Sequence, residues 1–224
     1  MDKKCSVNGY EDALIKSVIL KRTSYVYILF KRIIDIIGAV FGIVFLFPLI
    51  ILIGLLIKID SKGPALFVQK RCGRDGELFN MYKFRSMCTD AEQRLDEIQH
   101  LNETNGVIFK IKDDPRLTRV GKFIRKTSLD ELPQLVNVLK GEMSLVGPRP
   151  SLPNEVEQYQ SWQKLRLSVK PGLTGLWQIS GRSELGFDEM VRLDLEYIAK
   201  GNFFYDIIII FKTIPVVFKS RGAY

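Results

Sequence analysis

The sequence predicts a mixed α+β protein that is mostly helical, with an N-terminal membrane helix, a small β-hairpin and a compact domain carrying interfacial helices. Three observations lead to this class. Residues 36–57 contain no charge, two alternating apolar segments flank a turn at residues 73–76, and helical periodicity fills much of the remainder. The 224 residues are 46% hydrophobic and 11% aromatic, which argues against a disordered chain and allows one domain with an anchor.

The charge balance and the cysteines narrow the class of protein. With 33 Lys and Arg against 25 Asp and Glu, the net charge of +8 suits nucleic acid, an anionic membrane face or anionic substrates. Cys5, Cys72 and Cys88 form no Cys-x-x-Cys pair. We therefore expect a reducing compartment, with neither a disulfide framework nor a zinc site. His100 lies in a polar stretch, which favours a surface position over a catalytic one.

The uncharged segment at residues 36–57 is long enough to cross a bilayer, since a helix of this length measures about 33 Å. Pro48 lies near its middle and is expected to break the helix. Residues 1–32 and 58–77 are both rich in Lys and Arg, so the positive-inside rule places both flanks in the cytoplasm. A re-entrant hairpin that turns at Pro48 is therefore favoured over a straight span.

Three regions follow from this pattern. Residues 1–30 form a basic interfacial segment, residues 31–58 form the re-entrant membrane hairpin, and residues 59–224 form a domain at the cytoplasmic face. A second apolar stretch, residues 203–218, is too short and too interrupted to span. We expect an interfacial helix there, with a buried core helix as the alternative.

The other elements are predicted by range. A β-hairpin pairs residues 65–69 with residues 78–82. Helices are expected at residues 89–102, 117–126, 135–139, 154–167 and 187–200, the third ending at Gly141 and the last at Gly201. Loops are expected at residues 106–112 (or a short strand there), 147–150 and 171–181.

The run at residues 127–135 admits two interpretations. Ser128 and Glu131 have the spacing of a capping box, in which case Asp130 and Glu131 simply complement a helix dipole. Pro133 opposes this, because it would lie at the fifth helical position and lack the N–H needed there. A helix that begins later leaves the two carboxylates at or before its mouth, where phosphate also gathers. Basic residues crowd in just before the pair: Arg116, Arg119, Lys122, Arg125 and Lys126.

Several common phosphate-chemistry motifs are missing from the sequence. It contains no Walker-type phosphate loop, no Gly-x-Gly-x-x-Gly fingerprint and no Asp-x-Asp pair. What remains is the acidic pair, a set of arginines and stiff Gly/Pro loops. Lys83 and Arg85 share one face if their segment is extended, and Arg149 is held between two prolines. Guanidinium groups suit phosphate, although most of the basic residues are expected to be solvated charges.

A series of motifs follows in order along residues 29–224. They are Lys31-Arg32 with Asp35, the break at Pro48, Ser61–Pro64, Tyr82–Met87, Asp114–Gly121, Ser128–Gln134, Gly147–Pro150 and Pro171–Gly175. Their joint order resembles the bacterial sugar transferases, also called polyprenyl-phosphate hexose-1-phosphate transferases or monotopic phosphoglycosyl transferases. One departure is Phe47, which stands where many members have a serine before the helix-breaking proline.

The resemblance implies a membrane enzyme that initiates exopolysaccharide or capsule assembly. It would move a hexose-1-phosphate from a UDP-sugar to polyprenyl (undecaprenyl) phosphate and release UMP, at the cytoplasmic face of the bacterial inner membrane. Asp130 would be the nucleophile and form a phosphosugar-aspartyl intermediate, since a carboxylate needs no base to activate it. Mg²⁺ would be held by Asp130 and Glu131, with Glu131 acting either as metal ligand or as base.

The resemblance also assigns substrate-binding positions. Arg149 would bind the nucleotide or a phosphate, Lys83 and Arg85 would hold phosphates, and Arg125 would offset charge repulsion at the diphosphate. Asp194 matches a further acidic position of the family. Glucose or galactose is the expected sugar, while N-acetylated and diamino sugars stay open. A homo-oligomer is compatible with the sequence, no nucleic-acid partner is expected, and the chain would be a minimal form of the family.

Two other functional classes compete with this one. A non-enzymatic basic module, anchored in the membrane and binding lipid or nucleic acid, accounts for the charge and the apolar segment but not for the ordered motifs. A membrane scaffold accounts only for the apolar segments. The substitution Asp130→Asn separates the classes, because it removes the nucleophile of an enzyme and leaves binding or scaffolding nearly intact.

Overall fold

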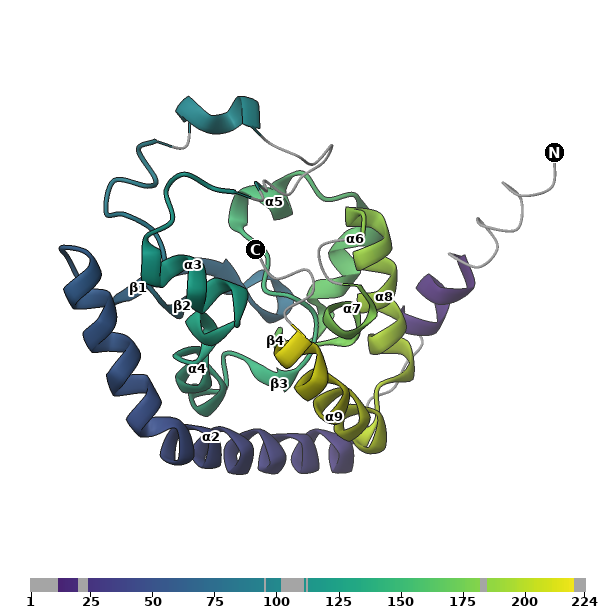
Figure 1. Ribbon diagram of the computed structural model, residues 1–224. Coiled ribbons are helices and arrows are strands. Elements are labelled where there is room, and N and C mark those ends of the chain that lie inside the picture. Colours follow the sequence, from purple (N-terminus) through teal and green to yellow (C-terminus); the bar gives the residue numbers. More distant parts are fainter. Residues whose placement is uncertain are drawn as a thin grey trace.

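The computed structural model describes residues 12–19, 24–94, 96–101, 111, 113–181 and 185–219. The expected mixture of many helices and little sheet is confirmed. One long helix, α2, borders the other elements on two adjacent sides, and two small sheets lie inside that border (Figure 1). The loop or strand predicted at residues 106–112 lies outside the described residues except for residue 111.

Helix α2 covers Tyr25–Asp60 and contains Pro48. Figure 1 shows one sharp change of direction along it, as expected where a proline removes a backbone hydrogen bond. The helix is long and apolar enough to cross a membrane, and only 11% of its most apolar window is buried. A core helix of a soluble domain would be mostly buried, so these exposed side chains indicate a membrane contact. The placement of both ends on one side of a bilayer stays a prediction.

The predicted hairpin is confirmed and its strands extend further than expected. Strand β1, Leu66–Cys72, pairs antiparallel with β2, Leu78–Phe84. The short turn η1, Arg74–Gly76, joins them, with Asp75 and Gly76 at positive φ angles of 55° and 82°. Glycine reaches this left-handed region without strain, which explains the tight reversal.

The elements around the acidic run are short. Helix α3 covers Arg119–Lys126, the 3₁₀ turn η3 covers Leu129–Glu131, and α4 covers Gln134–Lys140. Helix α4 ends at Gly141, whose φ of 83° gives the left-handed cap that was predicted. The guanidinium of Arg32, from α2, donates to the carbonyls of Val138 and Leu139 at 2.6 and 2.7 Å and so ties the end of α4 to the membrane helix.

Two predicted helices were wrong in form. Residues 89–94 form turns, followed by the 3₁₀ helix η2 at Asp96–Leu101, because a polar segment with a narrow apolar face gives a longer helix little to pack on. Residues 154–167 are divided among α5 (Pro153–Glu157), α6 (Ser161–Lys164) and η4 (Leu165–Ser168). The carboxylate of Glu155 and the amide of Gln163 accept from backbone N–H groups three residues earlier, so each restarts the chain as a new helix.

A second sheet was not predicted. Strand β3, Ser144–Val146, pairs parallel with β4, Gly172–Thr174, and α7 follows at Leu176–Ser180. The range 171–181 was therefore wrongly predicted as a loop. The parallel pairing joins segments far apart in the chain, and local patterns do not reveal such a partner. Between the two strands, residues 147–150 form the expected stiff loop.

The C-terminal helices are confirmed. Helix α8 covers Phe187–Lys200 and packs a buried face into the main apolar core. Helix α9 covers Phe203–Lys219 and is two-sided: Ile209 is fully buried, while a second row of large apolar side chains is exposed. That exposed row contains Phe204, Ile208, Phe211 and Ile214. Helix α9 thus combines both interpretations of residues 203–218, a core contact on one face and an apolar surface on the other.

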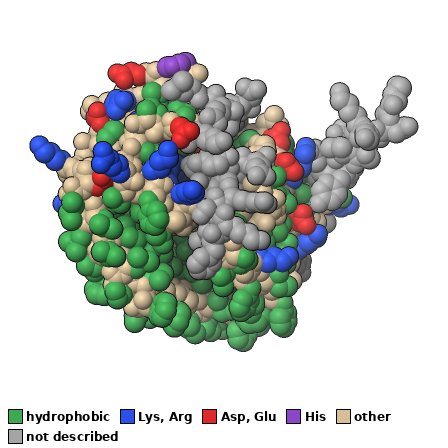
Figure 2. Space-filling view, in the orientation of Figure 1, with side chains coloured by type: hydrophobic (Ala, Val, Ile, Leu, Met, Phe, Trp, Pro, Cys, Tyr) green, Lys and Arg blue, Asp and Glu red, His purple; other side chains and the backbone are tan. Residues whose placement is uncertain are grey.

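Polar contacts fix α9 to the start of α2. The Lys31 ammonium donates to Asp206, to the Tyr197 hydroxyl and to the Val146 carbonyl, at 2.9, 3.1 and 2.9 Å. The Asp35 carboxylate accepts from Ser144 at 2.9 Å and from the Leu145 N–H at 2.8 Å. Figure 2 shows hydrophobic side chains gathered on the lower and left parts of the molecule, where Figure 1 places α2. One apolar surface is therefore held in fixed relation to the interior strands.

Candidate active site

The acidic pair lies in a tight turn before α4. Ser128 has a φ of 57°, and its side chain caps no helix. Helix α4 begins only at Gln134, directly after Pro133. The capping-box interpretation of Ser128 and Glu131 is therefore wrong, and the later helix start is confirmed. Asp130 and Glu131 both precede α4, so their side chains are not used to cap it.

The two carboxylates have different surroundings. Asp130 is buried, at 7% exposure, whereas the Glu131 side chain is 38% exposed. The Lys83 ammonium of β2 lies 3.0 Å from Oε1 of Glu131. Burial raises the pKa of Asp130 to about 6, the Lys83 and Arg125 charges oppose that rise, and the Glu131 charge adds to it. Asp130 is thus a carboxylate of raised basicity among cations, as suits a nucleophile that works near neutral pH.

Helix α3 brings Arg125 to the pair. Its backbone packs closely on the segment after β2, since a Cβ built on Gly121 meets the Ser86 carbonyl oxygen at 1.8 Å. The Asp60 carboxylate, at the end of α2, accepts from the Val120 N–H at 3.0 Å. The sequence places Arg125 in the last turn of this helix, just before the acidic turn. A helix anchored at its start to α2 and the hairpin therefore presents its basic end to Asp130.

Arg85 is placed differently from Lys83. Its buried guanidinium donates to the Lys62 carbonyl, the Ser61 carbonyl and the Ser61 hydroxyl, at 2.6, 2.9 and 2.8 Å. These contacts join β2 to the chain leaving α2, which is a structural role. Lys83 and Arg85, predicted to share one face, therefore bind different partners: Lys83 binds Glu131, and Arg85 binds the chain that leaves α2. Phosphate binding by Arg85 stays a prediction.

Arg149 lies on the loop after β3, and its guanidinium stands 5.8 Å from the centre of the Trp177 ring. A second arginine, which sequence reasoning missed, lies beside this loop. Arg71, near the end of β1, is buried and donates to the Pro150 carbonyl at 3.0 Å. In the sequence it was one basic residue in a basic flank, and only the fold shows its burial.

Asp194 is held inside the molecule. It forms a buried ion pair with Arg166, which also donates to the Tyr159 hydroxyl at 3.2 Å. Burial raises the pKa of Asp194 to about 6, although the charges of Arg166 and Arg149 oppose the rise. Sequence reasoning did not single out Arg166. The pair supports α8 against η4, and a substrate contact of Asp194 stays a prediction.

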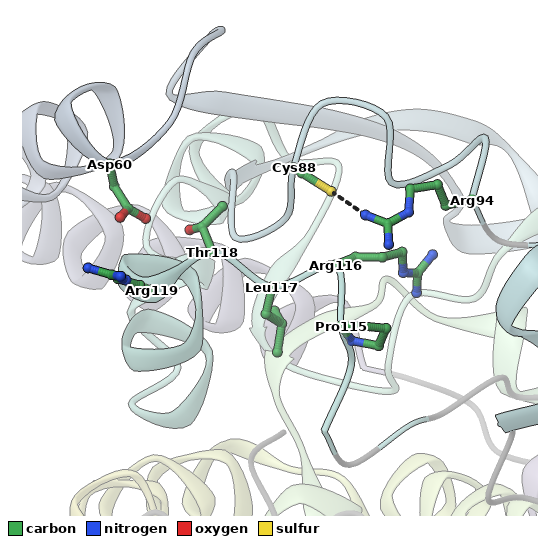
Figure 3. A pocket seen from close by; sticks show the side chains of 8 residues that line it. All are labelled: Asp60, Cys88, Arg94, Pro115, Arg116, Leu117, Thr118 and Arg119. Atoms are coloured by element: carbon green, nitrogen blue, oxygen red, sulfur yellow. Dashed lines mark hydrogen bonds between the residues drawn. The ribbon is translucent and has the colours of Figure 1, made fainter.

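A cavity of about 450 Å³ lies elsewhere (Figure 3). In Figure 3 the side chains of Asp60 and Arg119 lie on one side of it, and Cys88, whose sulfur accepts a hydrogen bond from Arg94, lies on the other. The cavity touches the first residue of α3, whereas Asp130 follows the end of that helix. Because neither Asp130 nor Glu131 lines it, this cavity is not the candidate active site.

The acidic pair offers a limited set of metal ligands. The described residues contain no group of three or more His, Cys, Asp or Glu that could hold a metal ion. Mg²⁺, however, is often bound through one or two carboxylates together with waters and substrate phosphates. Two adjacent carboxylates, one of them partly exposed, fit such a shared site. A magnesium requirement stays a prediction.

Comparison with known proteins identifies the family of the chain. The family model described as "Bacterial sugar transferase" matches residues 26–220. The chain is 48% identical over 218 residues to "Galactosyl transferase CpsE" of Streptococcus agalactiae, covering 97% of this chain and 48% of that protein. It is 46% identical over 202 residues to "Undecaprenyl-phosphate galactose phosphotransferase" of Salmonella typhimurium, covering 87% and 41%. To "Exopolysaccharide production protein ExoY" of Rhizobium meliloti it is 42% identical over 198 residues, covering 87% and 88%. The chain thus spans about half the length of the first two relatives and most of the third.

Proposed function

Because the chain belongs to the bacterial sugar transferase family, we propose that it transfers a hexose-1-phosphate from a UDP-sugar to polyprenyl phosphate and releases UMP. The observation that carries this proposal is Asp130, a buried carboxylate with a pKa raised to about 6, on which the Lys83 and Arg125 charges act. An acid held in this way is ionised at neutral pH and more basic than an ordinary aspartate.

In the first step, the Asp130 carboxylate attacks the phosphorus that carries the sugar. The bond from that phosphorus to the bridging oxygen of the diphosphate breaks, and the bond electrons leave with UMP. The repulsion between a carboxylate and a diphosphate is the main barrier to this approach. The Lys83 and Arg125 charges, which already lower the pKa of Asp130 against its burial, offset that repulsion.

In the second step, an oxygen of polyprenyl phosphate attacks the same phosphorus, and the bond to Asp130 breaks. The product is a polyprenyl diphosphate sugar, and the Asp130 carboxylate is restored. Glu131 and Asp130 would hold Mg²⁺ together with the substrate phosphates, where the ion would neutralise their charge. Glu131 lies at the more exposed edge of the pair, with Lys83 bound to it, which suits a group that meets the incoming acceptor.

The membrane placement follows from the acceptor. We propose that α2 enters and leaves the cytoplasmic leaflet of the bacterial inner membrane by its bend at Pro48, and that α9 lies at the interface. Exposed apolar side chains on both helices and the tie from Lys31 to Asp206 support a single membrane-facing surface. The phosphate of a lipid acceptor would then reach the site while it stays at the depth of the lipid headgroups.

Galactose is the sugar that we propose first. Two of the relatives have galactose or galactosyl in their names, at 48% and 46% identity, and the third is named for exopolysaccharide production. Initiation of exopolysaccharide or capsule assembly is the matching physiological role.

The test is lipid-dependent UMP release by the purified full chain in detergent, with Mg²⁺ and polyprenyl phosphate. UDP-galactose, UDP-glucose and UDP-N-acetylgalactosamine are compared side by side. We expect sustained release to be fastest with UDP-galactose, and without lipid we expect no more than one equivalent of UMP per enzyme. Omitting Mg²⁺ and adding a chelator should stop the reaction. Release from none of the donors would reject the proposed activity for these sugars, while release of many equivalents of UMP per enzyme without lipid would reject the acceptor.

A further inference from the structure

Arg71 is a buried cation without an ion-pair partner among the described residues. Its side chain is 6% exposed, at the inner end of β1. Its Nε and Nη2 donate to the Gln69 amide oxygen at 3.1 and 2.6 Å, and its Nη1 donates to the Pro150 carbonyl at 3.0 Å. A guanidinium has five N–H donors, so these three bonds leave further donor capacity. Buried arginines normally face a carboxylate or another anion.

The charge that acts most strongly on Arg71 is that of another cation, Arg149. Pro150, which accepts from Arg71, directly follows Arg149 in the chain. The Cys72 N–H donates to the Ser151 carbonyl at 2.9 Å, so the end of β1 is bonded to this loop at two adjacent positions. Burial and the Arg149 charge lower the pKa of Arg71 to about 10, against the opposing charges of Glu155 and Glu131. The fold therefore bonds Arg71 to the residue that follows Arg149, and no carboxylate of the described residues is hydrogen-bonded to Arg71.

Such an arrangement is unfavourable for an empty protein and favourable for one that binds an anion. Two guanidinium charges in a poorly solvated place repel each other. A bound dianion attracts both of them and so offsets that repulsion. The planar fork of each guanidinium matches phosphate oxygens. The Glu131 charge, which belongs to the acidic pair, also acts on Arg71 and favours its charged form.

We propose that Arg71 and Arg149 form a two-arginine clamp that binds a phosphate or diphosphate group of the substrate. Arg71 supplies the fixed half, locked by Gln69 and Pro150, and Arg149 supplies the more exposed half against Trp177. The inference rests on the proposed function for the identity of its ligand. The UDP diphosphate and the polyprenyl phosphate offer the same chemistry to the clamp, and the experiment separates them.

The test compares the purified full chain with Arg71→Gln, Arg71→Lys and the control Arg74→Gln. Arg74 lies in the same hairpin, but its side chain is exposed and pairs with its neighbour Asp75. Three probes are titrated by calorimetry: UDP, a short-chain prenyl phosphate and inorganic pyrophosphate. Loss of a charge-assisted hydrogen bond predicts a Kd increase of roughly ten- to a hundred-fold in Arg71→Gln. Arg71→Lys, which keeps the charge without the fork, should weaken binding less, and Arg74→Gln should match the parent.

The probe that loses affinity identifies the source of the phosphate. Weaker UDP binding places the clamp on the donor, and weaker prenyl phosphate binding places it on the acceptor. Unchanged Kd values for all probes in Arg71→Gln, with only a lower melting temperature, would show a purely structural arginine and overturn the clamp. If Arg71→Gln does not fold, an unchanged Kd in Arg71→Lys overturns it as well.

The pyrophosphate titration keeps this inference apart from the proposed function. Arg71-dependent pyrophosphate binding, with no UDP binding and no sugar transfer, would retain the clamp and reject the function. Sugar transfer with binding independent of Arg71 would retain the function and reject the clamp. A parent protein that binds none of the probes would reject both.

Discussion

The Lys83 ammonium binds Glu131 and not Asp130, with 3.0 Å between Nζ and Oε1. The ion pair joins β2 to the acidic turn and occupies the more exposed carboxylate. Asp130 has no ion pair within the described part of the chain, although the Lys83 charge still favours its ionised form. Glu131 is therefore held in place by an ion pair, and Asp130 is available to a substrate.

Lys83→Met should lower kcat, because it removes both the tether of Glu131 and a charge that favours the Asp130 carboxylate. We expect a loss of roughly ten- to a hundred-fold, the range of a charge-assisted contact. Steady-state UMP release measures it. Lys70→Met, an exposed lysine on the partner strand, is the matched control and should keep its activity. Equal rates in the two variants would remove Lys83 from the site.

Asp130→Asn should stabilise the fold at neutral pH. The folded pKa of about 6 exceeds the ordinary value of 3.8, so ionisation of Asp130 opposes folding as pH rises between these values. The stability that this group contributes is complete below pH 3.8 and lost above about 6. The neutral variant should gain up to about 3 kcal/mol at pH 7.5, and little at pH 4.

Thermal unfolding with a chelator present measures this difference at both pH values. Asp75→Asn, an exposed aspartate in a hairpin turn, is the control and should show no comparable pH-dependent gain. A melting temperature of Asp130→Asn that is lower than the parent's at pH 7.5 would contradict the burial of a charged Asp130.

Gly121→Ala should disrupt the packing of α3 on the segment that follows β2. The added methyl group would lie 1.8 Å from the Ser86 carbonyl oxygen, a rigid backbone atom, so the helix must move away from the hairpin. We expect destabilisation of about 2 kcal/mol or more, with reduced activity because Arg125 moves with the helix. Gly54→Ala is the control: it also lies within a helix, and nothing stands within 4 Å of its added Cβ. Similar melting temperatures for the two variants would contradict the close packing at Gly121.

Pro48→Leu should change the topology of α2. Removing the proline restores the missing backbone hydrogen bond and favours one straight helix, which can then span the bilayer. Single cysteines at Ser24 and Lys62 report the two ends to an impermeant thiol reagent. In the parent, both should label only after cells are lysed; in Pro48→Leu, one should label in intact cells. The background lacks the native thiols of Cys5, Cys72 and Cys88.

Labelling of either end in intact cells of the parent would reject the re-entrant form. A topology unchanged in Pro48→Leu would show that flanking charge, rather than the proline, fixes the turn.

Sequence patterns predicted the elements that depend on residues close to one another in the chain. The apolar run with Pro48, the hairpin with its glycine turn, and α8 with its following glycine all depend on neighbouring residues, and the structure contains them. For the acidic turn, Pro133 weakened one of two possible helix starts, and the structure decides between them by starting α4 at Gln134.

Features that depend on distant partners were not predicted. Strands β3 and β4 pair across a long separation, and each alone is too short to have a recognisable pattern. Arg71 and Arg166 differ from solvated arginines only by burial, which the packing of remote segments creates. The contacts of Arg85 with Ser61 and Lys62 come from the chain fold around α2 and were not predicted, while the phosphate binding that the family resemblance implied for Arg85 stays a prediction.

The measurement that tests the account most directly is trapping of the covalent intermediate. The purified chain is incubated with UDP-galactose labelled in its sugar-linked phosphate, without lipid, then digested and mapped by mass spectrometry. We predict label on the peptide containing Asp130, its loss on adding polyprenyl phosphate, and no label in Asp130→Asn. Sugar transfer to lipid by Asp130→Asn at the parent rate, or label on another residue, would contradict the role of Asp130 as the nucleophile.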